Sequence, residues 1–504
     1  MAKRALISVW DKTGVVEFAQ GLHELGYEII STGGTAKELT QAGVPVTPVS
    51  DVTGFPEILG GRVKTLHPKI HGGILARGIP DHEGELAAHG IGMIHVVAVN
   101  LYPFQETVAK GACLAEAVEQ IDIGGPTMVR AAAKNFERVT VIVNPAQYGP
   151  VLDELREGGE VPQDLRRRLA WEAFSHTARY DQAIAAYLGE EELLALEDAE
   201  KVQDLRYGEN PSQRAALYRV GESQGTLASS QQLQGKELSY NNWMDSDAAW
   251  AAVQEFDAPA CVVVKHTNPC GAAVGHTLEE AYIRALQGDP VSAFGGIVAC
   301  NQVVDGATAQ EMAKHFFEVI VAPGFTLEAR AVFEQKKNLR LLSVGKMGGA
   351  RRPAKQIRTI DGGYLVQDWD VGTTSREAWQ VVTAQAPSPE DWVELEFAWK
   401  VVKHVKSNAI VVAKNGQALG VGAGQMNRVG AAEIALEQAD AQAKGAYLAS
   451  DAFFPFPDTV EAAAAAGIRA IIQPGGSIRD EESIAAADKA GLIMVFTGRR
   501  HFKH

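Results

Sequence analysis

Cysteine is scarce in this chain. Its 504 residues include four, Cys113, Cys261, Cys270 and Cys300, and no two of them form a CxxC pair. Disulfide-stapled secreted domains and cysteine-rich zinc modules both need a denser and regularly spaced set, so neither class fits. The opening stretch MAKRALISVW enters a strand-like run at once and lacks the apolar segment of a secretory signal. We therefore expect a cytoplasmic protein.

Positive charge is also in short supply. The chain has 47 Lys and Arg residues against 62 Asp and Glu residues, a formal net charge of −15. Non-specific binding to nucleic acid depends on basic side chains that neutralise phosphates, so no nucleic-acid partner is expected. An acidic chain that binds anions has to gather its cations locally, and its basic loops are therefore candidate sites.

Long hydrophobic runs are missing as well. No apolar stretch approaches the roughly 20 residues that a membrane-spanning helix requires, so no membrane partner is expected. A hydrophobic content of 46% with 22% charged residues is typical of a globular protein. A chain of 504 residues is too long for one hydrophobic core, which predicts two or three domains.

The first 145 residues alternate between strand and helix patterns. Runs of β-branched and aliphatic residues are separated by segments with apolar residues at helical spacing, beginning with residues 15–25. Strands are expected at 5–9, 27–31, 44–49, 94–99 and 139–143, and further helices at 35–41, 115–120 and 164–188. Repeated strand–helix units indicate an α/β fold with a parallel sheet, whose ligands bind at the carboxyl ends of the strands.

The rest of the chain is interpreted as a separate region. The acidic stretch 191–204 is expected to be a linker between a domain at 1–190 and a domain at 205–504. The second domain mixes strands at 261–264, 296–299 and 409–413 with Ala-rich helices. A break near 345–390 divides it into two expected subdomains, although no internal repeat is visible at the level of motifs.

Three loops that follow the early strands suit an anion. They are SVWDKTG (8–14), STGGT (31–35) and the basic GGRVKTLHPK (60–69). Glycine lets backbone N–H groups approach an oxyanion, and a helix that follows directs its positive end at the same place. An ordinary capped turn explains each loop alone, and the Walker pattern is absent. Three such loops in one acidic chain favour a phosphate site.

A zinc site in the third loop is not expected. His67 and His71 have the spacing of two helical metal ligands, but Pro68 and the pair Gly72-Gly73 argue against a helix there. No acidic third ligand is evident in this loop.

Two ionisable residues follow an apolar run in CVVVKHTNPCGAAVG (261–275). Residues 261–264 read as a buried strand, and Asn268-Pro269 with Gly271 are expected to form the turn that ends it. Lys265 and His266 then have two interpretations, a charged strand exit at the surface or a catalytic pair.

Motifs along nearly the whole chain resemble one known family. In the first part they are DKTG (11–14), STGGTAK (31–37), GGRVKTLHPKIHGGIL (60–75), NLYPF (100–104), EQIDIGG (119–125) and RAAAKN (130–135). In the second part they are LRYGENP (205–211), KHTNPCGAAVG (265–275), SAFGG (292–296), GAGQMNR (422–428), SDAFFPF (450–456) and RRHFKH (499–504). The chain resembles the bifunctional family that joins 5-aminoimidazole-4-carboxamide ribonucleotide (AICAR) transformylase to inosine monophosphate (IMP) cyclohydrolase.

The resemblance implies a fold and two reactions. The expected fold is a methylglyoxal-synthase-like parallel-sheet domain followed by two cytidine-deaminase-like α/β subdomains. AICAR would take a formyl group from the co-substrate 10-formyltetrahydrofolate, and the product would then close to IMP with loss of water. No catalytic metal is implied. The partners implied are small molecules and a second copy of the chain, in a homodimer with shared transformylase sites.

For the transformylase the resemblance implies a catalytic pair and two binding sets. His266 would accept the amine proton of AICAR, and Lys265 would stabilise the charge that develops on the formyl oxygen. The AICAR set is Arg206, Tyr207, Gly295, Glu318, Asn408, Arg428, Phe453 and Arg500. The folate set is Val429, Asp458, Ser477 and Ile478, and Phe454 and Phe456 could pack on the pterin.

For the cyclohydrolase the resemblance implies a cofactor-free reaction within one bound molecule. The catalytic set is Lys64, Tyr102, Asp122 and Lys134, with Lys134 as the main candidate for handling the proton. The nucleotide would bind to Lys12, Thr32, Gly33, Gly34, Thr35, Arg62, Thr65 and Asn100. Without the resemblance, Lys134 would be an ordinary solvated helix residue.

Two other functions are considered, of which zinc-dependent deamination is rejected. Pro269-Cys270 resembles the start of a zinc-deaminase motif, but Ala273 stands where its second cysteine belongs and no HxE partner is present. A nucleotide-responsive binding module would explain the anion loops, but it would leave Lys265-His266 and the folate-like motifs unexplained.

Overall fold

The computed structural model describes residues 3–189, 199–220, 225–345, 355–372 and 375–504. The chain divides into two units, Met1–Asp198 and Ala199–His504. Most of the acidic stretch 191–204 lies outside the described residues, and its last part belongs to a strand that begins at Ala199.

The first unit is built around a parallel sheet. Its five strands are β1 (Lys3–Ser8), β2 (Tyr27–Ser31), β3 (Val46–Pro48), β4 (Val96–Val99) and β5 (Thr140–Ile142), in the order β3-β2-β1-β4-β5. Ala5 lies opposite Ile29 on one side and Val96 on the other, and all three side chains are buried. Helices cover both faces, so the central residues of β1, β2 and β4 are buried in continuous runs rather than alternately. The predicted parallel α/β arrangement is confirmed.

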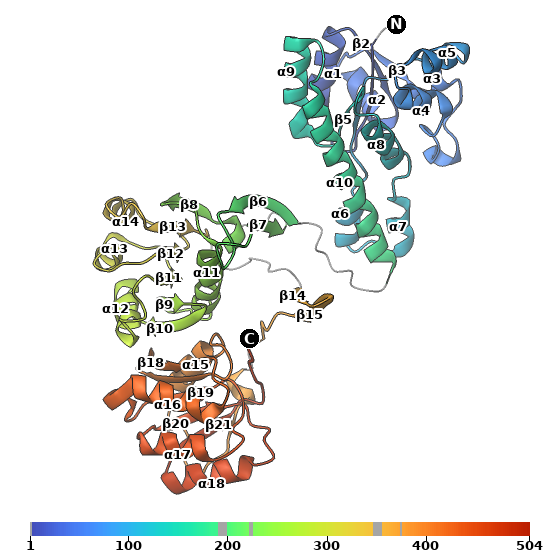
Figure 1. Ribbon diagram of the computed structural model, residues 1–504. Helices are drawn as coiled ribbons and strands as arrows, with labels where there is room; N and C mark the ends of the chain where they lie inside the picture. Colours follow the sequence, from blue (N-terminus) through green and yellow to red (C-terminus); the bar gives the residue numbers. More distant parts are fainter. Residues whose placement is uncertain (1–2, 190–198, 221–224, 346–354, 373–374) are drawn as a thin grey trace. The chain divides into compact units, whose positions relative to one another are not determined.

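The described part of this unit has ten α-helices. They are α1 (Val15–Glu24), α2 (Gly33–Gln41), α3 (Val49–Thr53), α4 (Pro68–Leu75), α5 (Pro80–Ala88), α6 (Phe104–Ala109), α7 (Leu114–Glu119), α8 (Gly124–Lys134), α9 (Tyr148–Gly158) and α10 (Gln163–Leu188). Of these, α6, α7 and the end of α10 extend beyond the sheet (Figure 1). The loops after β1, β2 and β4 meet at one edge of the sheet because parallel strands end together.

The helix α4 corrects one prediction. Pro68 was expected to prevent a helix, but it occupies the first turn, where proline's missing N–H has no helical partner to lose. His67 caps this helix by accepting a hydrogen bond from Lys69 N (3.2 Å). The two glycines, Gly72 and Gly73, are accommodated because Gly73 packs closely on the backbone of Gly92, where a Cβ would lie 2.5 Å from the carbonyl oxygen.

The second unit contains one sheet of twelve strands and two separate hairpins. The sheet order is β16-β21-β20-β19-β17-β18-β10-β9-β11-β12-β13-β8. Its strands are β8 (Gln231–Gln234), β9 (Ala260–Lys265), β10 (Asn268–Val274), β11 (Ile297–Cys300), β12 (Val319–Ala322), β13 (Arg340–Ser343), β16 (Gln380–Val381), β17 (Ile410–Lys414), β18 (Gln417–Gly422), β19 (Tyr447–Ser450), β20 (Ala470–Gln473) and β21 (Ile493–Phe496). The hairpins pair β6 (Ala199–Leu205) with β7 (Ala215–Val220) and β14 (Lys355–Ile360) with β15 (Gly363–Asp368).

Helices form layers on both faces of this sheet. They are α11 (Tyr240–Val253), α12 (Leu278–Gly288), α13 (Gly306–Met312), α14 (Leu327–Phe333), α15 (Pro389–Val402), α16 (Arg428–Ala439), α17 (Asp458–Ala465) and α18 (Asp480–Ala490). Helices α11 and α15 share one core with one face of the sheet. The other face packs in two separate cores, one with α12–α14 and one with α16–α18. Alternate strand residues serve the two faces, as Val262 and Val263 show.

The second unit is an internal repeat that the motifs did not reveal. The series β8, α11, β9, β10, α12, β11, α13, β12, α14, β13 is followed in the same order by β16, α15, β17, β18, α16, β19, α17, β20, α18, β21. Pairing repeats too, since β9 pairs with β10 and β11 as β17 pairs with β18 and β19. The two halves join through the antiparallel pair β10 and β18. The second half begins with β16 (Gln380–Val381), and the division into two subdomains near 345–390 stays a prediction.

Candidate functional site

In the first unit two of the predicted anion loops and part of the third converge on the start of α2. A Cβ added at Gly33 would lie 3.5 Å from Lys64 Nζ, and one added at Gly34 would lie 3.8 Å from Lys12 Nζ. Both ammonium groups therefore stand beside the positive end of this nine-residue helix. We call the group of Lys12, Gly33, Gly34 and Lys64 the anion cradle, because its chemistry suits a phosphate.

A carboxylate of the same chain already contacts the anion cradle. Thr32 Oγ1 donates a hydrogen bond to Glu57 Oε1 (2.9 Å), and Lys64 Nζ lies 3.3 Å from Glu57 Oε2. Sequence reasoning missed Glu57, which precedes the basic loop and carries no motif of its own. Its carboxylate stands where an anionic ligand would compete for the same donors.

Three predicted nucleotide-binding residues are engaged within the protein. The hydroxyl of Thr35 is buried and bonded to both backbone groups of Val9. The amide of Asn100 accepts hydrogen bonds from Trp10 N (2.6 Å) and Asp11 N (2.9 Å) and donates one to Asp11 O. The exposed Arg62 forms an ion pair with Glu119. The first two hold the loop after β1 in shape and position the anion cradle.

Asp122 lies at the start of α8, which adjoins the basic loop. It accepts a hydrogen bond from Gly125 N (2.8 Å), and burial raises the pKa of its carboxyl above the usual value. A Cβ at Gly124 would lie 2.9 Å from Thr65 Oγ1, so this helix start adjoins the basic loop. The partly exposed Tyr102 packs edge-on against Trp10 with ring centroids 5.5 Å apart. A half-buried carboxyl with a raised pKa, at a helix start that adjoins the basic loop, is suited to acid–base chemistry.

Lys134 does not join this group within the chain. It is the last residue of α8, whereas Asp122 and Thr65 adjoin the first turn of the same helix. Ten residues of helix separate Gly124 from Lys134, which corresponds to roughly 15 Å. The side chain of Lys134 is exposed.

In the second unit the sequence expectation for the catalytic turn is wrong in its position. The strand β9 continues to Lys265, the turn consists of His266 and Thr267, and β10 begins at Asn268 and contains Pro269. Proline is tolerated there because the pairing of β9 with β10 shifts register between Pro269 and Gly271, at a bulge. The opening residues of the motif therefore form a tight hairpin whose tip carries the imidazole.

The turn has a backbone conformation that its residues disfavour. His266 has φ 50° and Thr267 φ 63°, both in the left-handed region, which is least accessible to β-branched side chains. Asp245 on α11 accepts a hydrogen bond from Thr267 N (2.7 Å) and receives a second from the backbone of His266. Burial raises the pKa of Asp245 above the usual value, and the neighbouring N–H groups and cations oppose that shift. Asp245 thus holds the tip of the hairpin, a role that sequence reasoning missed.

The second half of the sheet contains an equivalent hairpin, also held by a carboxylate, with different turn residues. The hairpin β17–β18 turns at Asn415 (φ 54°) and Gly416 (φ 64°), the pair most suited to this turn. Glu394 accepts a hydrogen bond from Gly416 N (3.0 Å). Glu394 is the sixth residue of α15, and Asp245 is the sixth residue of α11, so the two carboxylates have equivalent positions. The comparison indicates that the turn is structural in both halves and that His266-Thr267 replaces the favourable pair for another reason.

Lys265 is fixed at the end of β9. Its Nζ donates hydrogen bonds to Phe294 O (2.8 Å) and Gly295 O (3.1 Å). Gly295 has φ 65°, and a Cβ there would lie 3.4 Å from Lys265 Nζ. The glycine therefore provides the space for the ammonium group, which brings predicted residues Lys265 and Gly295 together.

A buried ion pair orders the predicted residues of the second half. The guanidinium of Arg428 pairs with Asp451 and donates to Asn408 Oδ1 (2.6 Å) and Ser450 Oγ (3.2 Å). Only 5% of the Arg428 side chain is exposed, so it serves to hold the Asn408 amide rather than to reach a ligand. Sequence reasoning missed Asp451, although it lies within the motif SDAFFPF.

Both halves present their residues at one edge of the sheet. The tip at His266 lies at the start of β10, which runs antiparallel to β18, and Asn408 lies at the start of β17. Asn268 Oδ1 accepts a hydrogen bond from Lys406 N (2.9 Å) and links the two groups directly. The carboxyl ends of β18–β21 meet at this edge too, so the loops with Phe453, Asp458 and Arg500 reach it.

The other predicted AICAR-binding residues lie in loops and at strand ends of the second unit. The guanidinium of Arg206 stacks on the ring of Tyr207 at 5.2 Å. The loop that carries both residues is linked to α11, because Glu209 O accepts a hydrogen bond from the Asn241 side chain (3.4 Å). Asn241 lies one helical turn before Asp245. Glu318 forms an ion pair with Arg340 (2.6 Å) and is therefore already partnered. Phe453 and Arg500 are exposed, and Arg500 lies over Phe502.

The folate residues form a looser group. Asp458 begins α17, and Ile478 and Phe456 are exposed. Arg479 stacks on Phe456 at 4.8 Å and so brings the loop of Ser477 and Ile478 beside the start of α17. Val429 lies in the first turn of α16. The suggestion that Phe454 packs on a pterin is wrong, because this ring is fully buried in the core.

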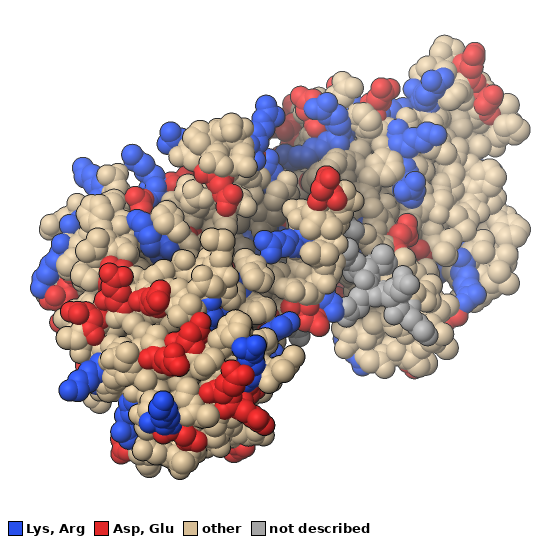
Figure 2. Space-filling model, turned by 60° about the horizontal axis from the view of Figure 1, so that its bottom comes forward, with Lys and Arg blue, Asp and Glu red and all other residues tan. Residues whose placement is uncertain are grey.

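Two further features concern the residues 3–189, 199–220, 225–345, 355–372 and 375–504 that the structure describes. Within them no group of three or more His, Cys, Asp and Glu side chains is arranged to hold a metal ion. None of the helices described there is long and apolar enough to span a membrane. On the face shown in Figure 2, acidic and basic side chains are interspersed, without a continuous basic stripe.

Comparison with known proteins gives matches over the whole chain. The family model of the AICARFT/IMPCHase bienzyme matches residues 132–438, and that of the MGS-like domain matches residues 14–127. Proteins named bifunctional purine biosynthesis protein PurH align over 100% of both chains, at 60% identity in Desulfitobacterium hafniense and 56% in Bacillus cereus and Synechocystis sp.. One solved structure, of ForH, covers 38% of this chain and all of its own at 37% identity, with a TM-score of 0.34.

Proposed function

This chain belongs to the AICARFT/IMPCHase bienzyme family, and from that premise we propose how its residues divide two reactions. It is a bifunctional enzyme of purine biosynthesis, which formylates the amine of AICAR and closes the product to IMP with loss of water. In our proposal residues 1–190 close the ring and residues 205–504 transfer the formyl group. The MGS-like match within 14–127 supports this division.

In the formyl transfer the amine of AICAR is a weak nucleophile because its lone pair is conjugated with the ring. His266 accepts its proton as the new C–N bond forms, and the bond between the formyl carbon and the donor nitrogen then breaks. The ammonium group of Lys265 faces the formyl oxygen, where negative charge develops. The observation that carries this assignment is the disfavoured His266-Thr267 turn, where the other half of the sheet uses Asn415-Gly416.

The nucleotide and the donor bind along the same sheet edge. Arg206, Tyr207 and Arg500 are exposed or half-buried and supply forked donors and a ring for the ribonucleotide. Asn408 is held by Arg428 and presents an ordered amide. The donor is 10-formyltetrahydrofolate, for which Val429, Asp458 and the Ser477-Ile478 pair supply apolar surface and a carboxylate. The proposal includes no catalytic metal.

In the ring closure the carboxamide nitrogen attacks the formyl carbon of the same molecule. The anion cradle holds the phosphate, which fixes nucleophile and electrophile in one pocket. Lys64 and Asp122, with its raised pKa, are the proton-transfer groups beside the cradle, and Tyr102 covers the purine precursor. Lys134 belongs to this set through the motif RAAAKN alone, and its position at the far end of α8 makes it the sharper residue to test.

The assembly and location complete the proposal. Large apolar side chains, including Phe294, Phe453 and Met426, are exposed around the transformylase edge, which supports a homodimer whose second copy covers them and shares the sites. A sedimentation mass of one chain at assay concentration would contradict the dimer. We propose a cytoplasmic location, in keeping with the scarcity of cysteine, and fractionation of cells tests it.

The full-length chain tests the division of labour. His266→Ala should lower formyl transfer from AICAR and donor by at least about 100-fold while formyl-AICAR still closes to IMP without folate. Lys134→Ala should instead lower the closure of formyl-AICAR to IMP while formyl transfer to AICAR continues. Retained formylation by His266→Ala would defeat the catalytic pair, and unchanged closure by Lys134→Ala would leave Lys64 and Asp122 as the proton-transfer groups. Circular dichroism of each variant separates these results from loss of folding.

The two alternatives make different predictions for the same protein. A zinc deaminase would carry stoichiometric zinc, whose removal would abolish activity. A binding module would bind formyl-AICAR without forming IMP. Either result would overturn the proposal.

A further inference from the structure

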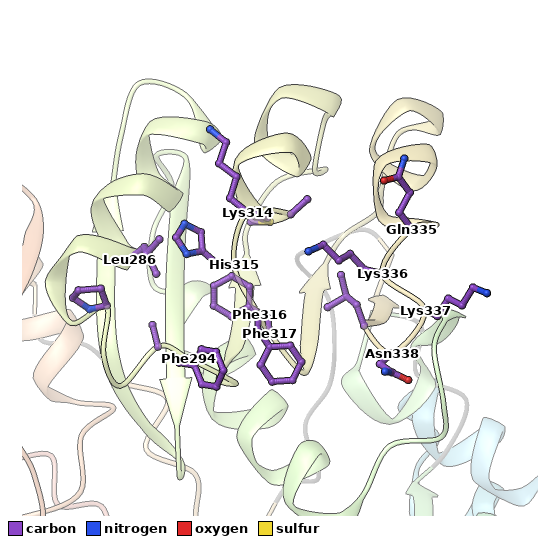
Figure 3. Close-up of a pocket in the computed structure, with 15 residues that line it drawn as sticks. Leu286, Phe294, Lys314, His315, Phe316, Phe317, Gln335, Lys336, Lys337 and Asn338 are labelled. Carbon is purple, nitrogen blue, oxygen red and sulfur yellow. The ribbon is translucent and has the colours of Figure 1, made fainter.

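A cavity of about 650 Å³ borders the proposed transformylase site (Figure 3). Phe294 is part of its lining, and the carbonyl of Phe294 accepts a hydrogen bond from Lys265 Nζ (2.8 Å). The C-terminal tail, residues 497–504, lines no part of this cavity. It brings Arg500 to the same edge of the sheet from the second half, and a carboxylate that belongs to no motif holds it in place.

Asp370 contacts the tail on both sides of Arg500. One oxygen of its carboxylate lies 2.8 Å from a guanidinium nitrogen of Arg499, and the other lies 2.5 Å from Nδ1 of His501. Because Arg499 and His501 share one carboxylate, their side chains lie on one side of the tail. Arg500 stands between them in the sequence and is exposed, so its side chain is directed away from Asp370.

His501 is the more deeply buried of the two partners of Asp370. Its side chain is 1% exposed, and its ring packs on Trp399 of α15 with centroids 5.1 Å apart. An ionised carboxylate only accepts hydrogen bonds, so Nδ1 of His501 carries the proton and donates it to Asp370. Burial of the carboxyl acts in the opposite direction, but the hydrogen bonds from His501 and Arg499 hold the pKa of Asp370 below its usual value. The carboxylate is therefore charged at neutral pH.

The tail is also fixed through its backbone. His501 N donates a hydrogen bond to Asp451 O (3.0 Å). Asp451 is the buried partner of Arg428, which holds the amide of Asn408. The backbone of the tail thus shares a support with Asn408, and Asp370 fixes the side chains on either side of Arg500.

We propose that Asp370 is a positioning residue for AICAR, which acts by setting the direction of Arg500. The forked donors of the Arg500 guanidinium suit the phosphate of the nucleotide. An arginine on an unsupported tail would lose more conformational freedom when the nucleotide binds, and a tail that is already fixed avoids part of that cost. This inference rests on the proposed function, in which Arg500 contacts the nucleotide. Because the phosphate is remote from the reacting amine, loss of Asp370 should weaken binding rather than chemistry.

The test measures initial rates of formyl transfer with the full-length protein. Asp370→Ala should raise KM for AICAR about tenfold, while kcat and the KM of the formyl donor stay within about twofold. Asp368→Ala is the matched control, because it removes the same charge two residues earlier. Asp368 is exposed and pairs with Lys355 on its own hairpin (2.8 Å), so this variant should leave every constant unchanged.

Two further variants show whether Asp370 acts through Arg500. Arg500→Ala should raise KM for AICAR at least as much as Asp370→Ala does. Adding Asp370→Ala to Arg500→Ala should then change KM no further, because the side chain that Asp370 positions is gone. Asp370→Asn keeps the volume and one acceptor oxygen, so it should retain the fold and raise KM less, about threefold.

Three outcomes would overturn the inference. A wild-type KM for AICAR in Asp370→Ala would mean that the other contacts fix the tail without this carboxylate. A full additional effect of Asp370→Ala in the Arg500→Ala protein would mean that Asp370 acts by another route. A wild-type KM in Arg500→Ala would remove Arg500 from the AICAR site, and the role of Asp370 with it. Failure of the wild type to formylate AICAR is a separate result, because it would defeat the proposed function itself.

Discussion

His266 and Thr267 place two disfavoured backbone conformations at the tip of one hairpin. A non-glycine residue in the left-handed region costs about 1–2 kcal/mol, and the cost is greatest for a β-branched side chain such as Thr267. Asp245 offsets part of that cost by accepting the N–H groups of the turn. The equivalent turn at Asn415-Gly416 carries a smaller penalty, because Asn and Gly tolerate the left-handed region best, so selection for folding alone would not maintain His-Thr.

Replacing Thr267 by glycine should separate stability from activity. Thr267→Gly removes the strained side chain, and we expect the free energy of unfolding to rise by about 1 kcal/mol after allowance for the entropy of glycine. We also expect kcat for formyl transfer to fall about tenfold, because the freer backbone no longer fixes the imidazole of His266. Denaturant titration and initial rates measure the two effects.

The other half of the sheet supplies the matched control. Gly416→Thr introduces a Cβ that lies 2.7 Å from the side chain of Val274. Gly416 is at the opposite edge of the sheet from His266. The substitution should therefore destabilise the protein without changing the kcat of the folded fraction. If Thr267→Gly gained stability and kept its full kcat, the turn would have no role in positioning His266.

At the scale of the element, the start of α2 and the loop of Glu57 compete for the same cations. The carboxylate of Glu57 contacts Thr32 and Lys64, which a phosphate in the anion cradle would need. Glu57→Gln removes that charge, so we expect IMP to bind about threefold more tightly, within the range of one partly exposed ion pair. Calorimetric titration measures the dissociation constant.

Glu38 provides the comparison for this change. It is exposed on α2, so Glu38→Gln alters the net charge equally without touching the cradle, and it should leave the affinity for IMP unchanged. Weaker binding by Glu57→Gln would show that the carboxylate organises the loop for the nucleotide instead of competing with it.

The elements were predictable where local pattern decides the outcome. The strand at 27–31 was placed to the residue, and the expected strands at 94–99 and 139–143 contain β4 and β5, because buried parallel strands are continuous runs of β-branched residues. Helix α4 was missed because a proline was interpreted as a breaker when it stands at the first turn. The turn at His266-Thr267 was misplaced because local sequence preference puts a turn at Asn, Pro and Gly. The position of the turn is instead fixed by Asp245 on α11, which accepts a hydrogen bond from Thr267 N.

The sites were predictable in part for a similar reason. Motifs singled out Lys12, Lys64 and Lys265, and the structure places each of them beside a glycine that leaves room for its side chain. Motifs could not show that Arg428 is buried against Asp451 or that Glu57 reaches the cradle, because both contacts join segments remote in sequence. The internal repeat is visible only in the order and pairing of strands.

At the scale of the whole molecule, the half-buried His95 in the first unit and the buried His404 in the second couple stability to pH. Burial, together with the charges of Arg138 and Lys3, lowers the pKa of His95 to about 4. Burial also lowers the pKa of His404 to about 4, although Glu255 beside it at 3.0 Å acts in the opposite direction. An unfolded histidine titrates near 6.5, so each of these groups binds a proton in the unfolded chain at a pH where the folded chain leaves it neutral.

The sign of the effect follows from that difference in bound protons. Between about pH 6.5 and pH 4 the unfolded state binds more protons, so the free energy of unfolding falls as the pH falls. We expect Tm to be several degrees lower at about pH 5 than at about pH 7.5, measured by scanning calorimetry. His404→Gln, which keeps a donor toward Glu255, should flatten this dependence for the second unit, whereas the exposed His23→Gln should not. A Tm that stayed constant or rose on acidification would show that these imidazoles gain protons in the folded protein as readily as in the unfolded chain.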